Sequence, residues 1–411
     1  GEPGPLIVVD QFGYLPGADK VAVLRDPVAG YDADLDYSPG ERLDVVSVAD
    51  GEVAFSAAPV AWNDGRIDDL SGDRIWWFDF SALTVPGRYV VVDAANGQRS
   101  PEFSIGEDVY RPVLREALRT FYYQRAGFPK KPPYADPAWQ DDASHLGPGQ
   151  DTEARLYSAR DDAGTARDLS GGWYDAGDFH RYTAWHANNV ITLLHAWLEN
   201  PDAWDDAAGI PESGNGIPDL VDEILFGLEW QKKMQDGAGG GGLLSILSVD
   251  EASPPSSATG PSVYGPATTN ASLVGAASFA LAAVAMERLP GARRDDYIKD
   301  LVRRAEAAWQ WSLAHPDAQF RNNEGDATGV GYGQQETDDA GRAVAWRRAA
   351  VYLFAATGKA EYHDYVRRTY GDTPVLRGGG HVDVHGERES ATMLWYTMLP
   401  GPVCGVMILP V

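Results

Sequence analysis

The spacing of apolar residues changes once along this chain, near Asp108. Before that point, short runs rich in Val, Ile and aromatic residues alternate with turn signals such as Val85-Pro86-Gly87. This pattern is typical of β-strands. After that point, apolar residues recur with the helical period through residues 110–127, where Pro112 falls in the first turn of the predicted helix. We therefore expect a β domain followed by an α domain.

The predicted strands all lie in the first hundred residues. They cover Leu6–Asp10, Val21–Leu24, Leu43–Val48, Val53–Ser56, Ile75–Phe80 and Arg88–Asp93. Short strands at this spacing predict a small β-sandwich. We assign residues 1–107 to this domain and interpret it as a rigid packing module with no ligand of its own.

Residues 108–411 are predicted to form the helical domain. After the first helix, the predicted helices cover Arg181–Glu199, Pro218–Gln235, Thr268–Leu289, Asp295–His315, Asp338–Ala356, Glu361–Thr369 and Glu389–Leu399. The stretch 271–286 is apolar on every side, which predicts a helix that is buried all round. Three long irregular connections, 128–181, 237–266 and 316–337, are where we expect functional groups.

The motif GGWYDAGDFHRYT at 171–183 carries the chemistry. Asp175 and Asp178 lie three residues apart, just before a predicted helix. Glycines permit a tight turn, and Trp173 and Tyr174 offer flat faces for a sugar ring. Paired carboxylates suit glycosidic cleavage. The residues alone leave two other interpretations open, a calcium loop and a cap on the following helix.

Composition limits the classes of molecule that this chain is expected to bind. The formal net charge is −26 and the sequence pI is about 4.6, so nucleic acid and anionic membranes are not expected partners. No apolar run reaches the ~18 to 20 residues of a membrane helix. The single Cys404 excludes an internal disulfide. No feature indicates a protein partner. An acidic chain rich in Trp and Tyr favours a secreted polysaccharide enzyme whose signal peptide has been removed.

The motif at 171–183 resembles the signature of glycoside hydrolase family nine, the inverting β-1,4-glucanases. The stretches VDQFGYLPGADKVAVL and PGRYVVVD resemble the immunoglobulin-like domain that precedes many family-nine catalytic domains. The resemblance implies a multidomain fold, an all-β immunoglobulin-like sandwich over 1–107 followed by an all-α (α/α)6 six-hairpin toroid over 108–411. It also implies a β-1,4-linked, cellulose-type polysaccharide or oligosaccharide as the substrate.

An inverting enzyme needs a base and an acid on opposite faces of the sugar, about 6.5 to 9.5 Å apart. Asp175 and Asp178 are too close in sequence to stand on opposite faces, so we expect both to act on the attacking water. The resemblance implies that Asp178 is the catalytic base and that Asp175 helps to hold the water.

The segment that carries the family's catalytic acid has no match in this sequence. The family places this acid on a Glu near the C-terminus of the catalytic domain. The sequence shows about eight helical runs, fewer than six hairpins need, and it ends in LPGPVCGVMILPV. We therefore expect a toroid that is incomplete at its C-terminus. Other available carboxylates are Glu336, Glu387 and Glu389, and the sequence does not rank them.

Three functions remain open. The first is an endo-β-1,4-glucanase. The second is an exo-acting β-glucosidase or glucosaminidase of the same family, and the third is a non-catalytic carbohydrate-binding protein that lacks the acid. By resemblance, His180 and Tyr332 are cleft residues and His381 stands in the place of a cleft Trp. A His gives a smaller stacking face and a titratable edge, which would alter how that subsite binds sugar.

The stretch Ile210–Glu223 predicts a calcium site. It resembles a family segment that lies at or near a calcium site in some members. Its oxygen donors would come from Glu212, Asn215, Asp219 and Asp222. The alternative is ordinary capping of the helix that follows.

Zinc is not expected. Family members with a structural zinc use two Cys and two His. The matching positions here hold Ala126, Ser144, His145 and Tyr174. A lone His cannot hold zinc, and we interpret His145 as a loop residue.

Overall fold

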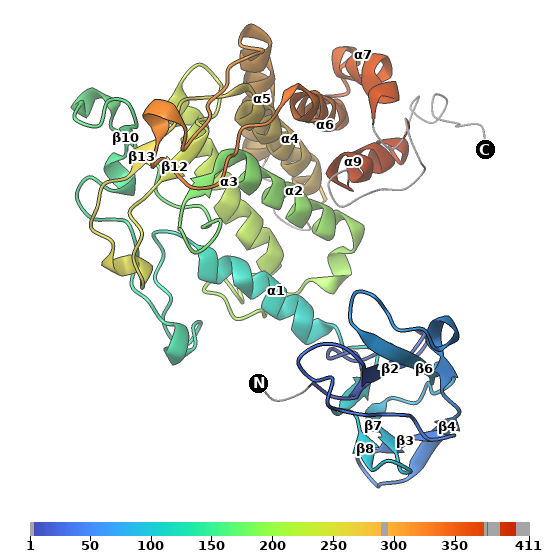
Figure 1. Ribbon diagram of the computed structural model, residues 1–411. Coiled ribbons are helices and arrows are strands. Elements are labelled where there is room, and N and C mark those ends of the chain that lie inside the picture. Colours follow the sequence, from blue (N-terminus) through green and yellow to red (C-terminus); the bar gives the residue numbers. More distant parts are fainter. Residues whose placement is uncertain (1–3, 289–294, 374–375, 377–386, 400–411) are drawn as a thin grey trace. The chain divides into compact units, whose positions relative to one another are not determined.

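The computed structural model describes residues 4–288, 295–373, 376 and 387–399. The chain divides into two compact units, Gly1–Ala117 and Leu118–Val411. The first is built from strands and the second mainly from helices (Figure 1). Each unit has a hydrophobic core of its own.

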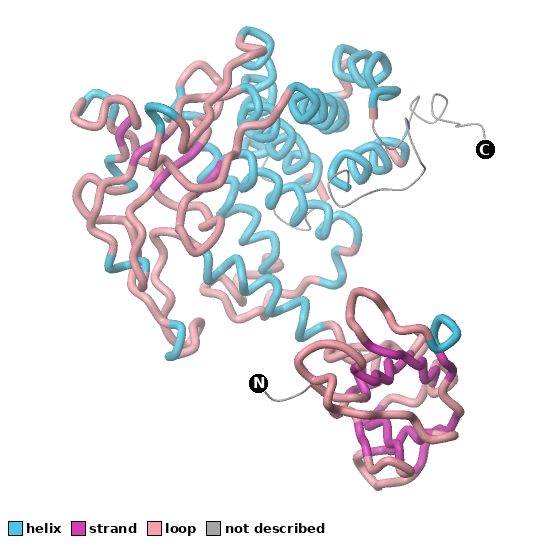
Figure 2. The backbone as a smooth tube through the Cα atoms, viewed as in Figure 1, coloured by secondary structure: helices cyan, strands magenta, loops and turns pink. Residues whose placement is uncertain are grey.

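The first unit contains two antiparallel sheets, drawn in magenta in Figure 2. One has the order β1 (Ile7–Val8), β2 (Val21–Pro27), β6 (Asp73–Asp79), β5 (Val60–Ala61). The other has the order β4 (Val53–Ala57), β3 (Leu43–Ser47), β7 (Gly87–Asp93), β8 (Gln98–Arg99), and β9 (Phe103–Ile105) also pairs with β7.

Side chains from both sheets meet in one core. Leu24 of β2 and Phe78 of β6 come from the first sheet, and Val45 of β3 and Val91 of β7 come from the second. Burial alternates along β2, as the period of a strand with one buried face requires. The predicted β-sandwich is confirmed.

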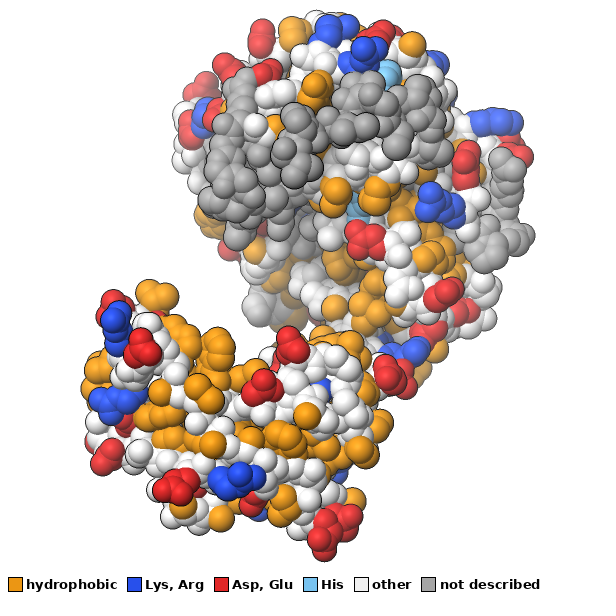
Figure 3. All heavy atoms as spheres, turned by 90° about the vertical axis from the view of Figure 1, so that its right-hand side faces the viewer, with side chains coloured by type: hydrophobic (Ala, Val, Ile, Leu, Met, Phe, Trp, Pro, Cys, Tyr) orange, Lys and Arg blue, Asp and Glu red, His pale blue; other side chains and the backbone are white. Residues whose placement is uncertain are grey.

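The outer surface of the first unit carries apolar side chains. Val60 and Trp77 lie opposite each other on β5 and β6 and are largely exposed, as is Leu70. Figure 3 shows many apolar side chains on one face of this unit. Parts of its surface are therefore apolar although the whole chain is strongly acidic.

The second unit contains most of the helices. They are α1 (Arg111–Gln124), which begins in the first unit, α2 (Thr183–Glu199), α3 (Asp219–Ala238), α4 (Thr269–Met286), α5 (Asp295–Ala314), α6 (Asp339–Thr357), α7 (Ala360–Thr369) and α9 (Glu387–Thr397). Helix α4 packs against α2, α5 and α6. Its length and composition would suit a membrane span, but 94% of it is buried inside the unit. The predicted all-round burial of this helix is confirmed.

Local signals set the ends of these helices. The Thr268 hydroxyl accepts a hydrogen bond from Ala271 N (3.2 Å) at the start of α4, and the Asp338 carboxylate accepts one from Gly341 N (2.8 Å) at the start of α6. Gly358 ends α6 with a left-handed φ of 67°. These are the capping residues that helix termini favour.

A small sheet joins the long connections of the second unit. Its order is β10 (Arg155–Leu156), β13 (Val263–Tyr264), β12 (Ile246–Ser248), β11 (Arg181–Tyr182). Strand β11 leads directly into α2. The third connection packs on the same place, because Val330 shares a buried cluster with Tyr182 and Ile246. The sheet therefore gathers all three predicted functional loops.

Candidate functional site

Asp175 and Asp178 belong to one tight turn that precedes β11. Asp175 N donates to His180 O (3.0 Å), and Phe179 N donates to Ala176 O (3.1 Å). Phe179 adopts a left-handed φ of 60° inside the turn. The backbone itself therefore fixes the two carboxylates near each other.

The glycines of the motif play unequal parts. Gly172 has a φ of 74°, and a Cβ at this residue would lie 2.7 Å from ring carbons of Trp230. Only glycine fits there without displacing the indole. Gly177 does not have a positive φ, and its Cβ would meet nothing within 4 Å. Within the turn, the left-handed conformation is thus taken by Phe179 and not by Gly177.

The two carboxylates form an electrostatically coupled pair. Asp178 Oδ1 is buried and has no hydrogen-bond partner among the residues that the structure describes. Burial, and then the charge of Asp178, raise the pKa of Asp175 to about 6, although part of Asp175 is exposed to solvent. The pKa of Tyr182 is raised mainly by burial and also by both carboxylates. A free carboxylate oxygen beside a second acid can accept a proton from water.

His180 lies at the end of the turn as a neutral donor. Its Nδ1 accepts a hydrogen bond from Val249 N (3.2 Å), so the ring proton is assigned to Nε2. Nε2 lies 4.0 Å from Glu251 Oε1. Burial lowers the pKa of His180 and outweighs the opposite effect of Asp178 and Glu251. The ring therefore keeps one N–H, on Nε2, in a residue that is only 3% exposed.

Tyr332 and Glu251 complete this polar group. Tyr332 is 62% exposed, and its ring centroid lies 5.5 Å from that of His180. A hydrogen bond to Glu251 raises the pKa of Tyr332. Tyr182 Oη holds the loop in place by accepting from the backbone N–H groups of Tyr332 (3.0 Å) and Gly333 (2.9 Å). Sequence reasoning missed Glu251, for which the signal was the length of the loop 237–266.

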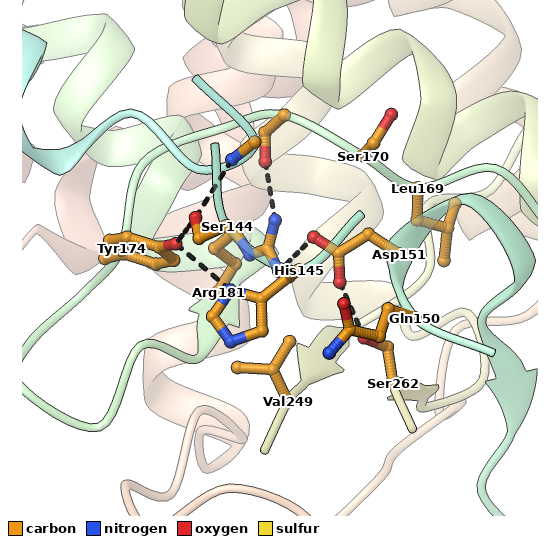
Figure 4. Close-up of polar contacts among 12 residues, drawn as sticks. Ser144, His145, Gln150, Asp151, Leu169, Ser170, Tyr174, Arg181, Val249 and Ser262 are labelled. Atoms are coloured by element: carbon orange, nitrogen blue, oxygen red, sulfur yellow. Dashed lines mark hydrogen bonds and ion pairs between the residues drawn. The ribbon is translucent and has the colours of Figure 1, made fainter. Parts of the chain in front are cut away.

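A buried ion pair joins Arg181, three residues after Asp178, to Asp151 (Figure 4). Arg181 and Asp151 are fully buried, and their side chains approach to 2.7 Å. Arg181 also donates to Gly171 O (2.8 Å), and Asp151 accepts from the Ser262 hydroxyl (2.6 Å). The pair therefore connects two of the long loops, 128–181 and 237–266, next to the acidic turn.

A directed chain of hydrogen bonds runs beside this ion pair (Figure 4). His145 Nε2 faces the carbonyl of Asp250 (3.0 Å), so Nδ1 accepts from the Tyr174 hydroxyl (3.1 Å). Tyr174 in turn accepts from Ser144, and Ser144 accepts from Gly127 N (3.3 Å). His145 is buried in this chain and is more than a loop residue. It ties the motif to the backbone next to Glu251.

Trp173 and Tyr174 do not offer faces to a sugar, which corrects the expectation from sequence. Their exposed fractions are 3% and 5%. Trp173 donates to Glu223 (3.2 Å) and stacks on His186, with ring centroids 4.6 Å apart. The aromatic residues of the motif belong to the core of the unit. His381, predicted to be a cleft residue, lies outside the described residues.

Two of the alternative acids have structural partners. Glu336 accepts hydrogen bonds from Phe320 N (2.9 Å) and Thr337 N (3.0 Å). Glu389 is buried in an ion pair with Arg347. The side chain of Glu387 lies outside the described part of the chain. Glu336 and Glu389 are therefore both engaged in structural contacts.

Comparison with known families now identifies the chain. The family model described as glycosyl hydrolase family 9 matches residues 110–401, and that of the cellulase N-terminal ig-like domain matches residues 2–98. The chain belongs to glycosyl hydrolase family 9. The sandwich over the first hundred residues is accordingly the immunoglobulin-like domain that the sequence predicts.

Relatives in family 9 are longer than this chain. A cellulose 1,4-beta-cellobiosidase of Acetivibrio thermocellus is 30% identical over 416 residues, which cover 92% of this chain and 44% of that protein. A xyloglucan-specific endo-beta-1,4-glucanase of Bacteroides ovatus is 31% identical over 386 residues, with 88% and 59% covered. The chain thus spans about half the length of these curated relatives.

Solved family-9 structures share the fold. A metagenome-derived glycoside hydrolase family 9 endoglucanase is similar with a TM-score of 0.75 and 30% identity. The match covers 95% of this chain and 71% of that one. The similarity therefore extends across both units of the chain.

The predicted calcium residues lie around the start of α3 and are not equivalent. Asp219 Oδ1 is buried without a hydrogen-bond partner in the described ranges. Burial raises the pKa of Asp222 to about 6, and neighbouring carboxylates add to this. Asn215 donates to Asp222 (3.0 Å). By contrast, Glu212 gives both oxygens to Arg125 (3.0 and 3.1 Å).

Asp219 and Asp222 therefore fit a hard cation in their chemistry, because oxygen donors with unrelieved negative charge are what calcium binds. Glu212 does not fit, since its charge is already balanced. Among the residues that the structure describes, no three His, Cys, Asp or Glu side chains are close enough together to hold a metal ion. At the positions that match the family's zinc ligands, Ser144, His145 and Tyr174 form the hydrogen-bond chain described above, and Ala126 is buried. That the chain binds no zinc remains a prediction.

Proposed function

We propose that this chain is an inverting glycoside hydrolase that cleaves β-1,4-glucan, with Asp178 as the base. The observation that carries the proposal is the buried oxygen of Asp178, which has no partner among the described residues and lies beside Asp175, whose pKa is raised to about 6. The substrate class is supported by the family-9 relatives, whose names describe cellobiosidases and endoglucanases.

In the proposed reaction, ionised Asp178 removes a proton from the attacking water. Asp175 accepts a hydrogen bond from the other O–H of this water and so orients its lone pair toward the sugar. The water oxygen bonds to the anomeric carbon as the glycosidic C–O bond breaks, and the departing oxygen takes a proton from solvent, because Glu336 and Glu389 are engaged in other contacts. The charge of both carboxylates stabilises the positive charge that develops on the ring during cleavage. The Nε2 proton of His180 and the exposed Tyr332 then bind sugar hydroxyls near the turn.

A second candidate is a carbohydrate-binding protein that keeps the turn but lacks an acid. The observation that favours it is the engagement of Glu336 and Glu389 in structural contacts. An exo-acting glucosidase or glucosaminidase depends on His381, which lies outside the described residues. Turnover separates the hydrolase from the binding protein.

Four further expectations from the sequence remain proposals. We propose that the helical unit is part of an (α/α)6 toroid and that the domain boundary lies at 107/108. We also propose that the protein is secreted and that calcium binds at Asp219 and Asp222 with help from Asn215. The buried free oxygen of Asp219 supports the calcium site.

The test is hydrolysis of a soluble substituted β-1,4-glucan, followed as release of reducing ends. We expect turnover by the unaltered chain and a loss of at least about a hundredfold in Asp178→Asn, because a general base contributes roughly 10² to 10⁴. Asp317→Asn is the matched control, since Asp317 is exposed in a different loop. Undiminished turnover by Asp178→Asn would refute the base assignment. Binding of cello-oligosaccharide without turnover would favour the second candidate.

A further inference from the structure

A cavity of about 490 Å³ lies in the second unit near the acidic turn. Its wall comes from helices α2, α4, α6 and α9 and from residues 334–337. Trp185 in this wall packs on Tyr182, with ring centroids 4.3 Å apart. The charges of Asp175 and Asp178 in turn raise the pKa of Tyr182, so the two carboxylates lie near it. The volume falls within the range of ligand pockets, roughly 300 to 1,000 Å³.

A buried arginine lines the cavity with uncharged partners. Arg348 is 5% exposed. Its guanidinium donates to Asn188 Oδ1 (2.7 Å) and to the Thr392 hydroxyl (3.3 Å). Burial lowers the pKa of Arg348, and this effect outweighs the opposite effects of Tyr352 and Glu389, yet an arginine stays charged in proteins. A buried charge without a carboxylate partner is costly.

The charge of Glu389 acts on Arg348, but no ion pair joins Arg348 to a carboxylate in the part of the chain that the structure describes. Glu336 is held by two backbone N–H groups, and Glu389 is paired with Arg347. Arg388 also lines the cavity. The described wall therefore combines two arginines with carboxylates that are already engaged, which favours an anionic occupant.

The wall also holds an acceptor without a donor. Gln335 is 2% exposed, and its Nε2 donates to Phe320 O (2.9 Å). Its Oε1 is buried and has no partner within the described part of the chain. An O–H donor would satisfy this oxygen. The nearby Trp185 adds an aromatic surface of the kind that sugar rings pack against.

We propose that this cavity binds a sugar residue that carries a carboxylate, that is, a uronic acid. The carboxylate binds Arg348 with Arg388 close by, and a ring hydroxyl donates to Gln335 Oε1. Planar guanidinium groups suit carboxylates because two parallel hydrogen bonds can form. The proposal goes beyond cleavage of neutral glucan, which needs no cation in the wall, and it does not depend on hydrolysis.

Calorimetric titration of the whole chain tests this inference with three probes: glucuronate, glucose and acetate. Glucuronate should bind, and glucose and acetate should each bind at least about tenfold more weakly, because each lacks one of the two recognised groups. Glucose binding as tightly as glucuronate would overturn the role of the arginines. Acetate binding as tightly would overturn recognition of the sugar.

Arg348→Gln should weaken glucuronate binding about tenfold or more, since it removes charge-assisted hydrogen bonds. Arg303→Gln is the matched control, because Arg303 is exposed on α5 outside the cavity. Should the buried substitution prevent folding, Arg388→Gln at an exposed residue decides the matter with an expected loss of several-fold. Unchanged affinity in a folded variant of either arginine would overturn the proposal. Loss of glucan hydrolysis alone would bear on the proposed function and leave this binding result intact.

Discussion

At the scale of single residues, the sequence predicts which groups are present more reliably than where they point. Asp175 and Asp178 could be predicted to act together because a spacing of three places them on one turn. The burial of Trp173 and Tyr174 could not, since it depends on the positive φ of Gly172 and on packing against distant residues, such as that of Trp173 on His186. The unpartnered Gln335 oxygen likewise depends on the tertiary fold.

The raised pKa of Asp175 predicts the acid limb of the pH profile. Since both carboxylates must be ionised to hold and deprotonate the water, kcat/KM should rise with pH through a midpoint near 6. Asp175→Asn should remove the limb near pH 6, because the group whose pKa lies there is gone, while also reducing the rate. Rates measured from pH 4 to pH 8 test this. A midpoint that stays near pH 6 in the variant would contradict the assignment of this limb to Asp175.

The raised pKa of Asp175 also makes the stability of the fold depend on pH. The folded state holds the Asp175 proton more tightly than the unfolded chain, whose Asp titrates near about 4. This contribution to stability is therefore complete below about pH 4, and it is lost as the pH rises through about 6. The effect should be small because Asp175 is exposed.

At the scale of elements, long periodic segments were predictable and very short ones were not. The change near Asp108 and the apolar stretch 271–286 predict the order of the two units and the buried helix α4. The sheet of β10, β11, β12 and β13 escaped prediction because strands of two or three residues show no periodicity. That sheet brings Glu251 close to His180, so the contact between these two residues could not be predicted either.

Gly172 and Gly177 provide a matched pair that tests the turn. Gly172→Ala should lower the free energy of unfolding by about 2–5 kcal/mol, because the new Cβ meets Trp230 and the backbone keeps a strained φ. Gly177→Ala should change it by no more than about 0.5 kcal/mol, since open space surrounds it. Urea unfolding of both variants gives these values. Equal losses in the two variants would contradict this account of the turn.

At the scale of the whole molecule, the sequence predicts a family-9 chain with a β-sandwich ahead of a helical unit, and the matched ranges confirm the family. The sequence could not rank Glu336 and Glu389 as acids, because the contacts that engage them come from the tertiary fold. The central claim is therefore the part of the mechanism assigned to the acidic turn, namely attack by a water that Asp178 activates.

The stereochemistry of the product tests that claim most directly. Proton NMR of a β-1,4-glucan digest, recorded from the first minutes, should show the α-anomer of the new reducing end before mutarotation, because a water activated by Asp178 attacks the face opposite the leaving group. This signal should vanish in Asp178→Asn and persist in Asp317→Asn. Initial formation of the β-anomer would indicate a covalent intermediate and would contradict the account.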